Sequence, residues 1–244
     1  MKILGIIPAR YGSSRFPGKP LAKIGGKTMI ERVFLGCSEC TKLSEIIIAT
    51  DDIRIANETE AFGGKVMMTR QDHLTGTSRC AEVARQFDRM DWIINIQGDE
   101  PLIHAQILDD LIQVIHSHEG AQLATLIRKI EDPNLTANPN LVKAVITKQN
   151  TALYFSRSMI PYPRNPVVDQ DYYQHVGIYA YRSDILQEIN DLPVSNLEST
   201  ESLEQLRWLE NGYTIHVGIT QFESHAVDIP EDIGVIEKYL NSYK

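Results

Sequence analysis

Three cations follow a short apolar segment close to the N-terminus. The segment, residues 3–7, predicts a buried strand, and Arg10, Arg15 and Lys19 lie in the loop that follows it. This loop also contains glycine and serine, which let backbone N–H groups come close to a ligand. Its cations are spaced to surround a polyanion rather than to lie along one helix face. The loop therefore predicts a site for a phosphate-rich ligand at the carboxyl end of a first strand.

The same region resembles the phosphate-binding loop of Walker-type NTPases without matching it. Gly12 and Gly18 are separated by five residues instead of four, and Pro20 replaces the hydroxyl residue that would bind magnesium. A second candidate, residues 25–28, has the correct ending but lacks the first glycine. We therefore exclude a Walker-type NTPase, and we expect the two glycines at 25 and 26 to form a turn before the next helix.

Two aspartates far apart in the sequence have the chemistry of magnesium ligands. Asp99 follows the apolar segment 92–96 and Gly98, so it is expected at the carboxyl end of a buried strand. Asp228 precedes Pro230 and the last helical segment. Magnesium commonly takes one or two protein carboxylates and completes its shell with phosphates and water. Each aspartate has a plainer alternative, in which Asp99 belongs to a helix-capping turn and Asp228 caps the final helix.

The hydrophobic pattern predicts the scaffold that must position these residues. Strands are expected at 46–50, 65–68, 92–96, 123–130 and 141–147, and helices at 28–37, 52–62, 77–87 and 105–116. This alternation predicts an α/β fold with a mainly parallel sheet and helices on both faces. Shorter pieces with several prolines begin at about residue 131. Because no linker or repeat interrupts the chain, a single domain over residues 1–244 is expected.

Charge and composition limit the partners of the chain. With 32 acidic and 24 basic residues the formal net charge is −8, which disfavours nucleic acid and anionic membranes. No apolar run approaches the ~20 residues of a transmembrane helix. The chain enters a core strand at once, which leaves no room for a signal peptide, so a cytoplasmic location is expected. Cys37 and Cys40 have no second cysteine pair, which weighs against a metal or redox site.

Eight segments, in order across nearly the whole chain, carry a resemblance to known enzymes: IIPARYGSSRFPGKPL, IATDD, TRQDHLTGTSR, INIQGDEPLI, ALYFSRSMIPYPR, HVGIYAYR, LEQLRWLENGYTIHV and VDIPEDI. They resemble the 3-deoxy-manno-octulosonate cytidylyltransferases. The resemblance implies a Rossmann-like nucleotidyltransferase fold, a homodimer and a Mg²⁺ cofactor. It also implies transfer of CMP from CTP to the anomeric hydroxyl of 3-deoxy-manno-octulosonic acid (Kdo), with release of pyrophosphate, for lipopolysaccharide synthesis.

The resemblance further implies roles for individual residues. The catalytic residues would be Lys19, Asp99 and Asp228, and the two aspartates would bind Mg²⁺. The residues around the nucleotide would be Pro8, Ala9, Arg10, Arg15, Lys19, Arg70, Thr75, Gly76 and Arg79. The residues around the sugar acid would be Gln97, Arg157, His175, Tyr179, Glu204 and Gln205. Residues 1–130 would then bind the nucleotide, and residues 131–244 would bind the sugar and form the dimer.

Three positions depart from the usual pattern of that family. Ser78 replaces a carboxylate in the polar loop of residues 70–79. Gln174 stands where an arginine is common, and Ser199 replaces a frequent histidine. These differences leave the sugar open, and an amino-substituted Kdo such as 8-amino-Kdo or another 3-deoxy-ulosonic acid is the alternative substrate. A nucleotide-binding regulatory protein without turnover is the alternative from a different functional class.

Overall fold

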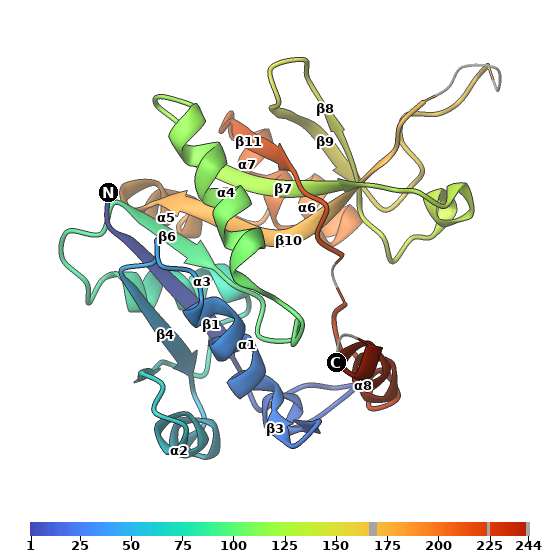
Figure 1. Cartoon of the computed structure of the whole chain (residues 1–244). Helices are drawn as coiled ribbons and strands as arrows, with labels where there is room; N and C mark the ends of the chain where they lie inside the picture. Colours follow the sequence, from blue (N-terminus) through green and yellow to red (C-terminus); the bar gives the residue numbers. More distant parts are fainter. Residues whose placement is uncertain (166–169, 224, 243–244) are drawn as a thin grey trace. The chain divides into compact units, whose positions relative to one another are not determined.

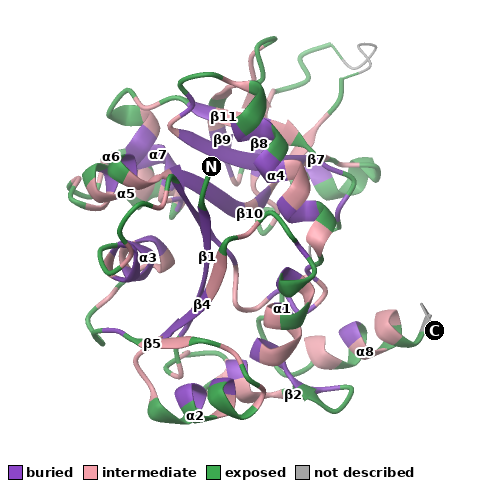
Figure 2. Cartoon of the chain, turned by 60° about the vertical axis from the view of Figure 1, so that its left-hand side comes forward, coloured by how far each residue is buried: buried purple, intermediate pink, exposed green. Residues whose placement is uncertain are grey.

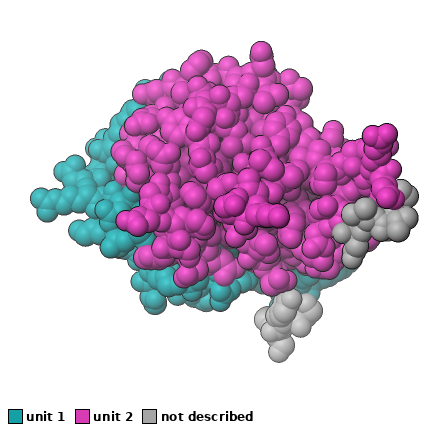
Figure 3. Space-filling model, turned by 90° about the horizontal axis from the view of Figure 1, so that it is seen from above, with its two compact units in different colours: residues 1–109, 224–244 teal, residues 110–223 magenta. Residues whose placement is uncertain are grey.

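Two compact units make up the chain, and Figure 3 colours them separately. The computed structural model describes residues 1–165, 170–223 and 225–242. The first unit contains residues 1–109 and 224–244, and the second contains residues 110–223. The C-terminal segment therefore belongs to the same unit as the N-terminal strand. The expectation that the chain acts as a single domain, with a functional division near residue 130, stays a prediction.

A parallel sheet forms the centre of the first unit (Figure 1). Its strands are β1 (Ile3–Ala9), β4 (Glu45–Thr50), β5 (Val66–Met68) and β6 (Trp92–Asn95), in the spatial order β6-β1-β4-β5. The pairings of these four strands are all parallel, as the sequence predicted. β1 and β6 are buried at nearly every position, the pattern of strands covered on both faces. Figure 2 shows this burial for β1. Because parallel strands end at a common edge, the loops after β1 and β6 lie beside each other.

Side-chain caps mark the starts of three helices in this unit. Thr28 caps α1 (Met29–Ser38), and its side chain accepts a hydrogen bond from a backbone N–H of the first turn. Asp52 does the same for α2 (Ile53–Ala61), and Thr75 for α3 (Gly76–Ala84). The helix α4 (Ala105–Ser117) follows the loop after β6. The expected helices are thus present, and Thr75 has a structural task at the start of α3.

A small hairpin packs against the last helix of the chain. The hairpin consists of β2 (Lys23–Ile24) and β3 (Lys27–Thr28), and the predicted turn between them has positive φ values of 53° at Gly25 and 85° at Gly26. The last helix, α8 (Asp232–Ser242), contacts β2. An apolar cluster joins the hairpin, α1 and α8 through the buried side chains of Ile24, Met29, Val227 and Ile236. This cluster fixes the segment that carries Asp228.

The second unit is built on a mixed sheet. In it, β7 (Leu123–Lys129) pairs in parallel with β11 (Ile215–Ile219) and antiparallel with β10 (Tyr173–Arg182). The antiparallel strands β8 (Lys143–Ile146) and β9 (Ala152–Ser156) extend it beside β10. The helices of this unit are α5 (Ser183–Asn190), α6 (Asn196–Glu201) and α7 (Gln205–Glu210). Among the described helices of both units, none is long and apolar enough to span a membrane.

Candidate active site

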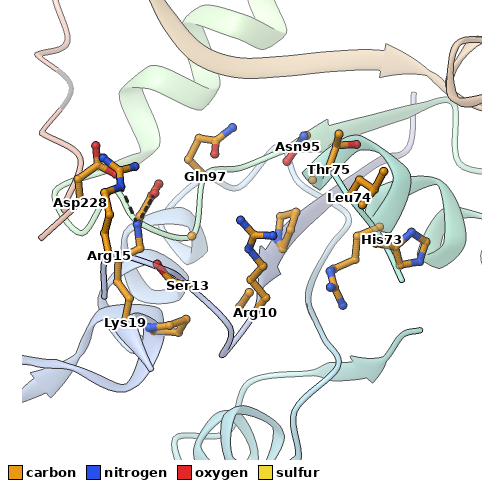
Figure 4. Close-up of a pocket in the computed structure, with 17 residues that line it drawn as sticks. Arg10, Ser13, Arg15, Lys19, His73, Leu74, Thr75, Asn95, Gln97 and Asp228 are labelled. Atoms are coloured by element: carbon orange, nitrogen blue, oxygen red, sulfur yellow. Dashed lines mark hydrogen bonds and ion pairs between the residues drawn. The ribbon is translucent and has the colours of Figure 1, made fainter. Parts of the chain in front are cut away.

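A cavity of about 270 Å³ lies in the first unit where β1 and β6 end (Figure 4). Four segments line it: the loop after β1, the start of α3 with the residues before it, the loop after β6, and the segment before α8. The predicted site residues in this lining are Pro8, Ala9, Arg10, Arg15, Lys19, Thr75, Gly76, Arg79, Gln97, Asp99 and Asp228. The lining residues that sequence reasoning missed are Ser13, Pro20, His73, Leu74, Asn95 and Gly98.

One ammonium group joins the two predicted magnesium ligands. Lys19 Nζ lies 2.7 Å from Asp99 Oδ2 and 4.0 Å from Asp228 Oδ1. It also donates a hydrogen bond to the Val227 carbonyl oxygen at 2.7 Å. Arg15 Nη2 lies 2.9 Å from the same oxygen of Asp228. Two carboxylates that are far apart in the sequence therefore meet at one end of the cavity, together with two of the three cations of the first loop.

Backbone packing holds the two aspartates at this end. The Val227 N–H donates to the Asp99 carbonyl oxygen at 2.9 Å, which ties the segment before α8 to the loop after β6. Gly98 passes so close to β1 that a Cβ atom there would lie 2.6 Å from the Pro8 carbonyl oxygen. Glycine is required at this position because any side chain would collide with the backbone of β1. The approach of the two backbones places Asp99 directly beside the cation loop.

Among the described residues, the carboxylate of Asp228 contacts Arg15 and Lys19 rather than the N–H groups of the last helix, whose cap was its alternative role. The hydrogen bonds run the other way, because Asp232 Oδ2, at the start of α8, accepts the N–H of Asp228 at 2.7 Å and the N–H of Ile229 at 3.0 Å, and both of these residues precede the helix. The carboxylate of Asp228 is instead directed toward Arg15, and its side chain is 50% exposed. Figure 4 shows this pair beside Lys19. The Asp228 carboxylate is therefore available to a ligand in the cavity.

The donor atoms at this end suit a hard divalent cation. Carboxylate oxygens are preferred ligands of Mg²⁺, and the side chains of Asp99 and Asp228 are 29% and 50% exposed, so a ligand can reach them. The ammonium group between them shows that the site stabilises positive charge. Within the described residues, no group of three or more His, Cys, Asp or Glu side chains could hold a metal ion. A pair of carboxylates still fits Mg²⁺, because phosphates and water can complete its shell.

The opposite end of the cavity is formed by α3 and the residues before it. His73, Leu74, Thr75 and Asn95 lie there, as labelled in Figure 4. Arg79 also lines the cavity, but it is buried and its Nη2 lies 3.3 Å from Asp51 Oδ2, so its charge is largely offset. Lys19 and Arg15 at the first end are paired with Asp99 and Asp228 in the same way, so among the described lining residues Arg10 is the cation without an ion-pair partner. The two ends differ because the first could hold a cation between its two carboxylates, which suits a molecule with a polyanionic end and a neutral end.

Arg70 is a predicted nucleotide-binding residue that does not line the cavity. Its side chain is 68% exposed, and its Nε lies 3.2 Å from Asp72 Oδ1. Its backbone is held more firmly, because the Arg70 carbonyl accepts a hydrogen bond from Arg79 Nη1 at 3.4 Å and its N–H donates to Glu82. The guanidinium group is exposed and paired with Asp72, so a direct role of Arg70 in nucleotide binding stays a prediction.

The other predicted sugar-binding residues, apart from Gln97, lie in the second unit. Arg157 follows β9, and its Nε donates to the Glu201 carbonyl oxygen at 2.8 Å. Glu204 Oε1 lies 2.6 Å from Arg207 Nη2. Gln205, at the start of α7, is buried. Arg157 and Glu204 are thus held by neighbours in their own unit, and the contact of all three residues with a sugar stays a prediction.

His175 and Tyr179 lie on β10 within an aromatic cluster. The ring of His175 lies 5.1 Å from that of Phe155 and 5.2 Å from that of Tyr179, and its Nε2 lies 3.0 Å from Thr125 Oγ1. Burial lowers the pKa of His175 to about 3, so the ring is neutral near pH 7. Tyr179 Oη is buried without a hydrogen-bond partner among the described residues. An unpaired buried hydroxyl is costly, and a ligand that bonds to it would remove that cost.

Cys37 and Cys40 are free, buried thiols. Burial raises the pKa of Cys37 far above its usual value, and the neighbouring Cys40 adds to this effect. Cys40 Sγ lies 3.7 Å from Asp109 Oδ1, and burial raises the pKa of this thiol as well. Thiols that resist ionisation are poor nucleophiles and poor metal ligands, so the geometry gives the metal or redox alternative no support.

The parallel sheet, the strand-end cavity and its cations and carboxylates define a nucleotide-dependent α/β enzyme, and comparison with known proteins identifies the family. A family model described as cytidylyltransferase matches residues 4–218. The chain therefore belongs to the cytidylyltransferase family, and it is a nucleotidyltransferase.

The relatives define the similarity further. The 3-deoxy-manno-octulosonate cytidylyltransferases of Parabacteroides distasonis and Phocaeicola vulgatus are each 49% identical to this chain, over 96% and 98% of both proteins. A solved structure of CMP:2-keto-3-deoxy-manno-octonic acid synthetase complexed with CTP has a TM-score of 0.95 at 42% identity, over the whole of both chains. The 4-diphosphocytidyl-2C-methyl-D-erythritol synthase of Anaerococcus prevotii shares the fold, with a TM-score of 0.65 at 14% identity. The predicted Rossmann-like nucleotidyltransferase fold is confirmed.

Proposed function

We propose that this protein transfers CMP from CTP to the anomeric hydroxyl of Kdo and releases pyrophosphate. The observation that carries this proposal is the convergence of Asp99 and Asp228 on Lys19, in a cavity that Arg10 and Arg15 also line. Similarity to Kdo cytidylyltransferases over nearly the whole chain supports both substrates. The product, CMP-Kdo, supplies Kdo for lipopolysaccharide.

CTP would lie along the cavity with its triphosphate at the charged end. Arg15 and Lys19 lie at that end, and Arg10 lines the cavity between the two ends (Figure 4). The cytidine would lie at the opposite end, against the loop before α3 and Pro8 of β1. This orientation is supported by the two carboxylates at the first end, which could hold a cation against the triphosphate, whereas Arg79 at the other end is paired with Asp51.

Asp99 and Asp228 would hold Mg²⁺ at the charged end. The bound ion would neutralise phosphate oxygens and make the attacking sugar hydroxyl more acidic. The chain's own contribution is to keep two like charges together. Lys19 offsets their repulsion, and the backbone hydrogen bond from Val227 to Asp99 sets their spacing.

The transfer itself is an in-line displacement at the α-phosphorus. The Kdo hydroxyl oxygen forms a bond to this phosphorus, the bond from phosphorus to the pyrophosphate oxygen breaks, and the hydroxyl proton passes to solvent. Catalysis of such a transfer depends mostly on positioning and charge neutralisation. Lys19, Arg10 and Arg15 would offset the negative charge of the departing pyrophosphate.

Gln97, in the lining of the cavity, is expected to contact the sugar acid. The residues of the second unit to which the family resemblance gives the same role are Arg157, His175, Tyr179, Glu204 and Gln205. Arg157 is suited to the carboxylate of the sugar acid, because a guanidinium can donate two parallel hydrogen bonds. The unpaired hydroxyl of Tyr179 and the neutral ring of His175 are suited to sugar hydroxyls.

We expect the enzyme to act as a homodimer and in the cytoplasm, where CTP is available. Its mass in solution, measured by light scattering, tests the dimer.

A pyrophosphate-release assay tests the proposed function. The purified protein would be supplied with Mg²⁺, each of the four nucleoside triphosphates, and either Kdo, 8-amino-Kdo or a sialic-type sugar acid. We expect release only with CTP and Kdo together. Equal or faster release with 8-amino-Kdo would make 8-amino-Kdo the sugar substrate, while the proposed transfer of CMP from CTP would still hold. Binding of CTP without sugar-dependent release under any of these conditions would contradict the proposal.

A further inference from the structure

One wall of the cavity is a loop that contains a single apolar residue, Leu74. Residues 69–75 connect the strand β5 to the helix α3, and three of them, His73, Leu74 and Thr75, line the cavity. Leu74 is 88% exposed, so hydrophobic packing of this side chain does not hold the loop in place. The position of the wall must therefore come from hydrogen bonds.

A single carboxylate on α3 holds the loop at two points. Glu82 accepts the backbone N–H of Arg70 at 3.3 Å and 3.2 Å through its two oxygens. The same carboxylate is hydrogen-bonded to His73 Nε2. The side chain of His73 is only 5% exposed, whereas that of Glu82 is 27% exposed. The start and the middle of the loop are thus fastened to the same residue.

The other ring nitrogen of His73 faces the start of the same helix. His73 Nδ1 lies 3.1 Å from Ser78 Oγ, and Ser78 Oγ lies 3.0 Å from the Thr75 carbonyl oxygen. Ser78 and Glu82 are four residues apart, so they lie on one face of α3. The imidazole therefore bridges two successive turns of the helix. In Figure 4 the ring lies beside Leu74 and Thr75 at the end of the cavity away from Lys19.

The carboxylate of Glu82 is ionised in this arrangement. Partial burial would raise its pKa, but the hydrogen bonds from His73 and from the Arg70 N–H outweigh burial and hold the pKa below its usual value. An ionised carboxylate can only accept hydrogen bonds, so Nε2 of His73 must carry a proton. The contact is a charge-assisted hydrogen bond, which is stronger than a bond between neutral groups.

We propose that His73 is a positioning residue for nucleotide selection, and this inference rests on the proposed function. By donating Nε2–H to Glu82 it keeps the loop wall in one conformation, so that the wall accepts cytosine and rejects uracil. The two bases differ in which ring positions donate and accept hydrogen bonds. A wall of polar groups discriminates between them only when the groups cannot turn to suit the wrong base. Loosening the wall should therefore weaken selection rather than the chemical step.

A matched pair of amides separates the two ring nitrogens of His73. In His73→Gln the terminal amide can take the place of Nε2 and still donate to Glu82. In His73→Asn the shorter amide can reach only the position of Nδ1. We expect His73→Asn to raise KM for CTP at least about tenfold and to narrow the ratio of kcat/KM for CTP over UTP at least about tenfold. With His73→Gln both quantities should stay within about threefold of the original protein.

The value of kcat at saturating CTP distinguishes a positioning role of His73 from general damage to the enzyme. In His73→Asn, kcat at saturation should fall no more than about threefold, because the groups at the charged end are untouched. Glu82→Gln is a second variant in case His73→Asn fails to fold. We expect it to raise KM for CTP and to narrow the ratio of kcat/KM for CTP over UTP in the same way, with kcat at saturation nearly unchanged. The control is Glu45→Gln, which removes a carboxylate paired with Lys65 at 2.7 Å and should leave KM for CTP unchanged.

Three outcomes would overturn the inference: unchanged KM and selectivity in His73→Asn, equal loss in the Gln and Asn variants, or an equal effect of Glu45→Gln. The original protein is measured first, in the same assay and by calorimetric titration with CTP. If it releases no pyrophosphate with any sugar acid, the proposed function fails. The titrations of the variants with CTP and UTP still test the loop wall in that case.

Discussion

Replacing Asp99 by asparagine is expected to abolish transfer while leaving the fold intact. The two side chains have nearly the same shape, and the variant differs by one negative charge. Asparagine Oδ1 can still accept the hydrogen bond that Lys19 Nζ donates to Asp99 at 2.7 Å. The hydrogen bond from Val227 to residue 99 is made by backbone atoms and is also retained. The substitution therefore removes charge from the charged end of the cavity without removing its scaffold.

The two expected magnitudes differ widely. The side chains of Lys19 and Asp99 are 15% and 29% exposed, so solvent screens their attraction. The loss of stability should be only about 1 kcal/mol, which lowers Tm by about 2–4 °C for a chain of this size. By contrast, removal of one preorganised electrostatic contact in an active site lowers kcat by roughly 10²–10³. We expect a loss in this range or greater, because the Asp99 carboxylate is also a proposed metal ligand.

Pyrophosphate release and thermal unfolding, measured on one preparation, give both magnitudes. The matched control is Asp184→Asn, which changes an exposed carboxylate whose Oδ1 lies 2.7 Å from Arg182 Nε and should leave turnover unchanged. Turnover by Asp99→Asn above about a tenth of the original rate would refute the assignment of this residue. A fall in Tm well beyond that expected would show that activity was lost through unfolding, and the reasoning from geometry would then be wrong.

Three further predictions concern stability. Gly98→Ala should lower Tm by roughly 2–10 °C, since the new methyl group would lie 2.6 Å from the Pro8 carbonyl oxygen, and an unchanged melting curve would contradict this. Lys143→Met should cost about 3 kcal/mol or more in urea unfolding, because the buried ammonium donates to three backbone carbonyls that would lose their partner; a cost below about 1 kcal/mol would refute this role. His175 has a folded pKa of about 3 against an ordinary value of 6.5. Its contribution to the free energy of unfolding is therefore complete above pH 6.5 and declines as the pH falls toward 3. The decline should reach up to about 2 kcal/mol at pH 5 and be missing in His175→Asn, and equal pH slopes for the two proteins would contradict it.

Local sequence patterns were sufficient for the first half of the site. The apolar run before Arg10 and the run before Asp99 each predicted a strand, and parallel strands end at one edge of a sheet. That rule alone brings the cation loop and Asp99 together. The predicted turn at Gly25 and Gly26 is present for a similarly local reason, because positive φ angles favour glycine.

Long-range packing decided the remainder. Nothing near Asp228 in the sequence indicates that Val227 enters the cluster of Ile24 and Met29, yet this contact brings Asp228 to the cavity. The role of Asp228 was ambiguous from the sequence, because only the structure shows that its carboxylate contacts Arg15 and Lys19.

The sequence pattern also could not predict the directions of the side chains. In the polar loop before α3 and the start of that helix, the resemblance implied four nucleotide-binding residues, Arg70, Thr75, Gly76 and Arg79, and the last three line the cavity. In the structure the guanidinium of Arg70 is exposed, while His73 lines the cavity. The sequence signal for His73 was its position in that loop, with Glu82 nine residues later. This spacing indicates a contact between the two side chains only once the loop is known to fold back on α3.

A crystal structure with CTP and Mn²⁺ in place of Mg²⁺ tests the central claim most directly, because the anomalous signal of manganese locates the ion independently of the protein atoms. The account predicts a peak within coordination distance of carboxylate oxygens from both Asp99 and Asp228, and of the α-phosphate of CTP. A nucleotide whose metal ion lies away from both aspartates, or whose triphosphate lies at the end of the cavity near His73, would contradict it.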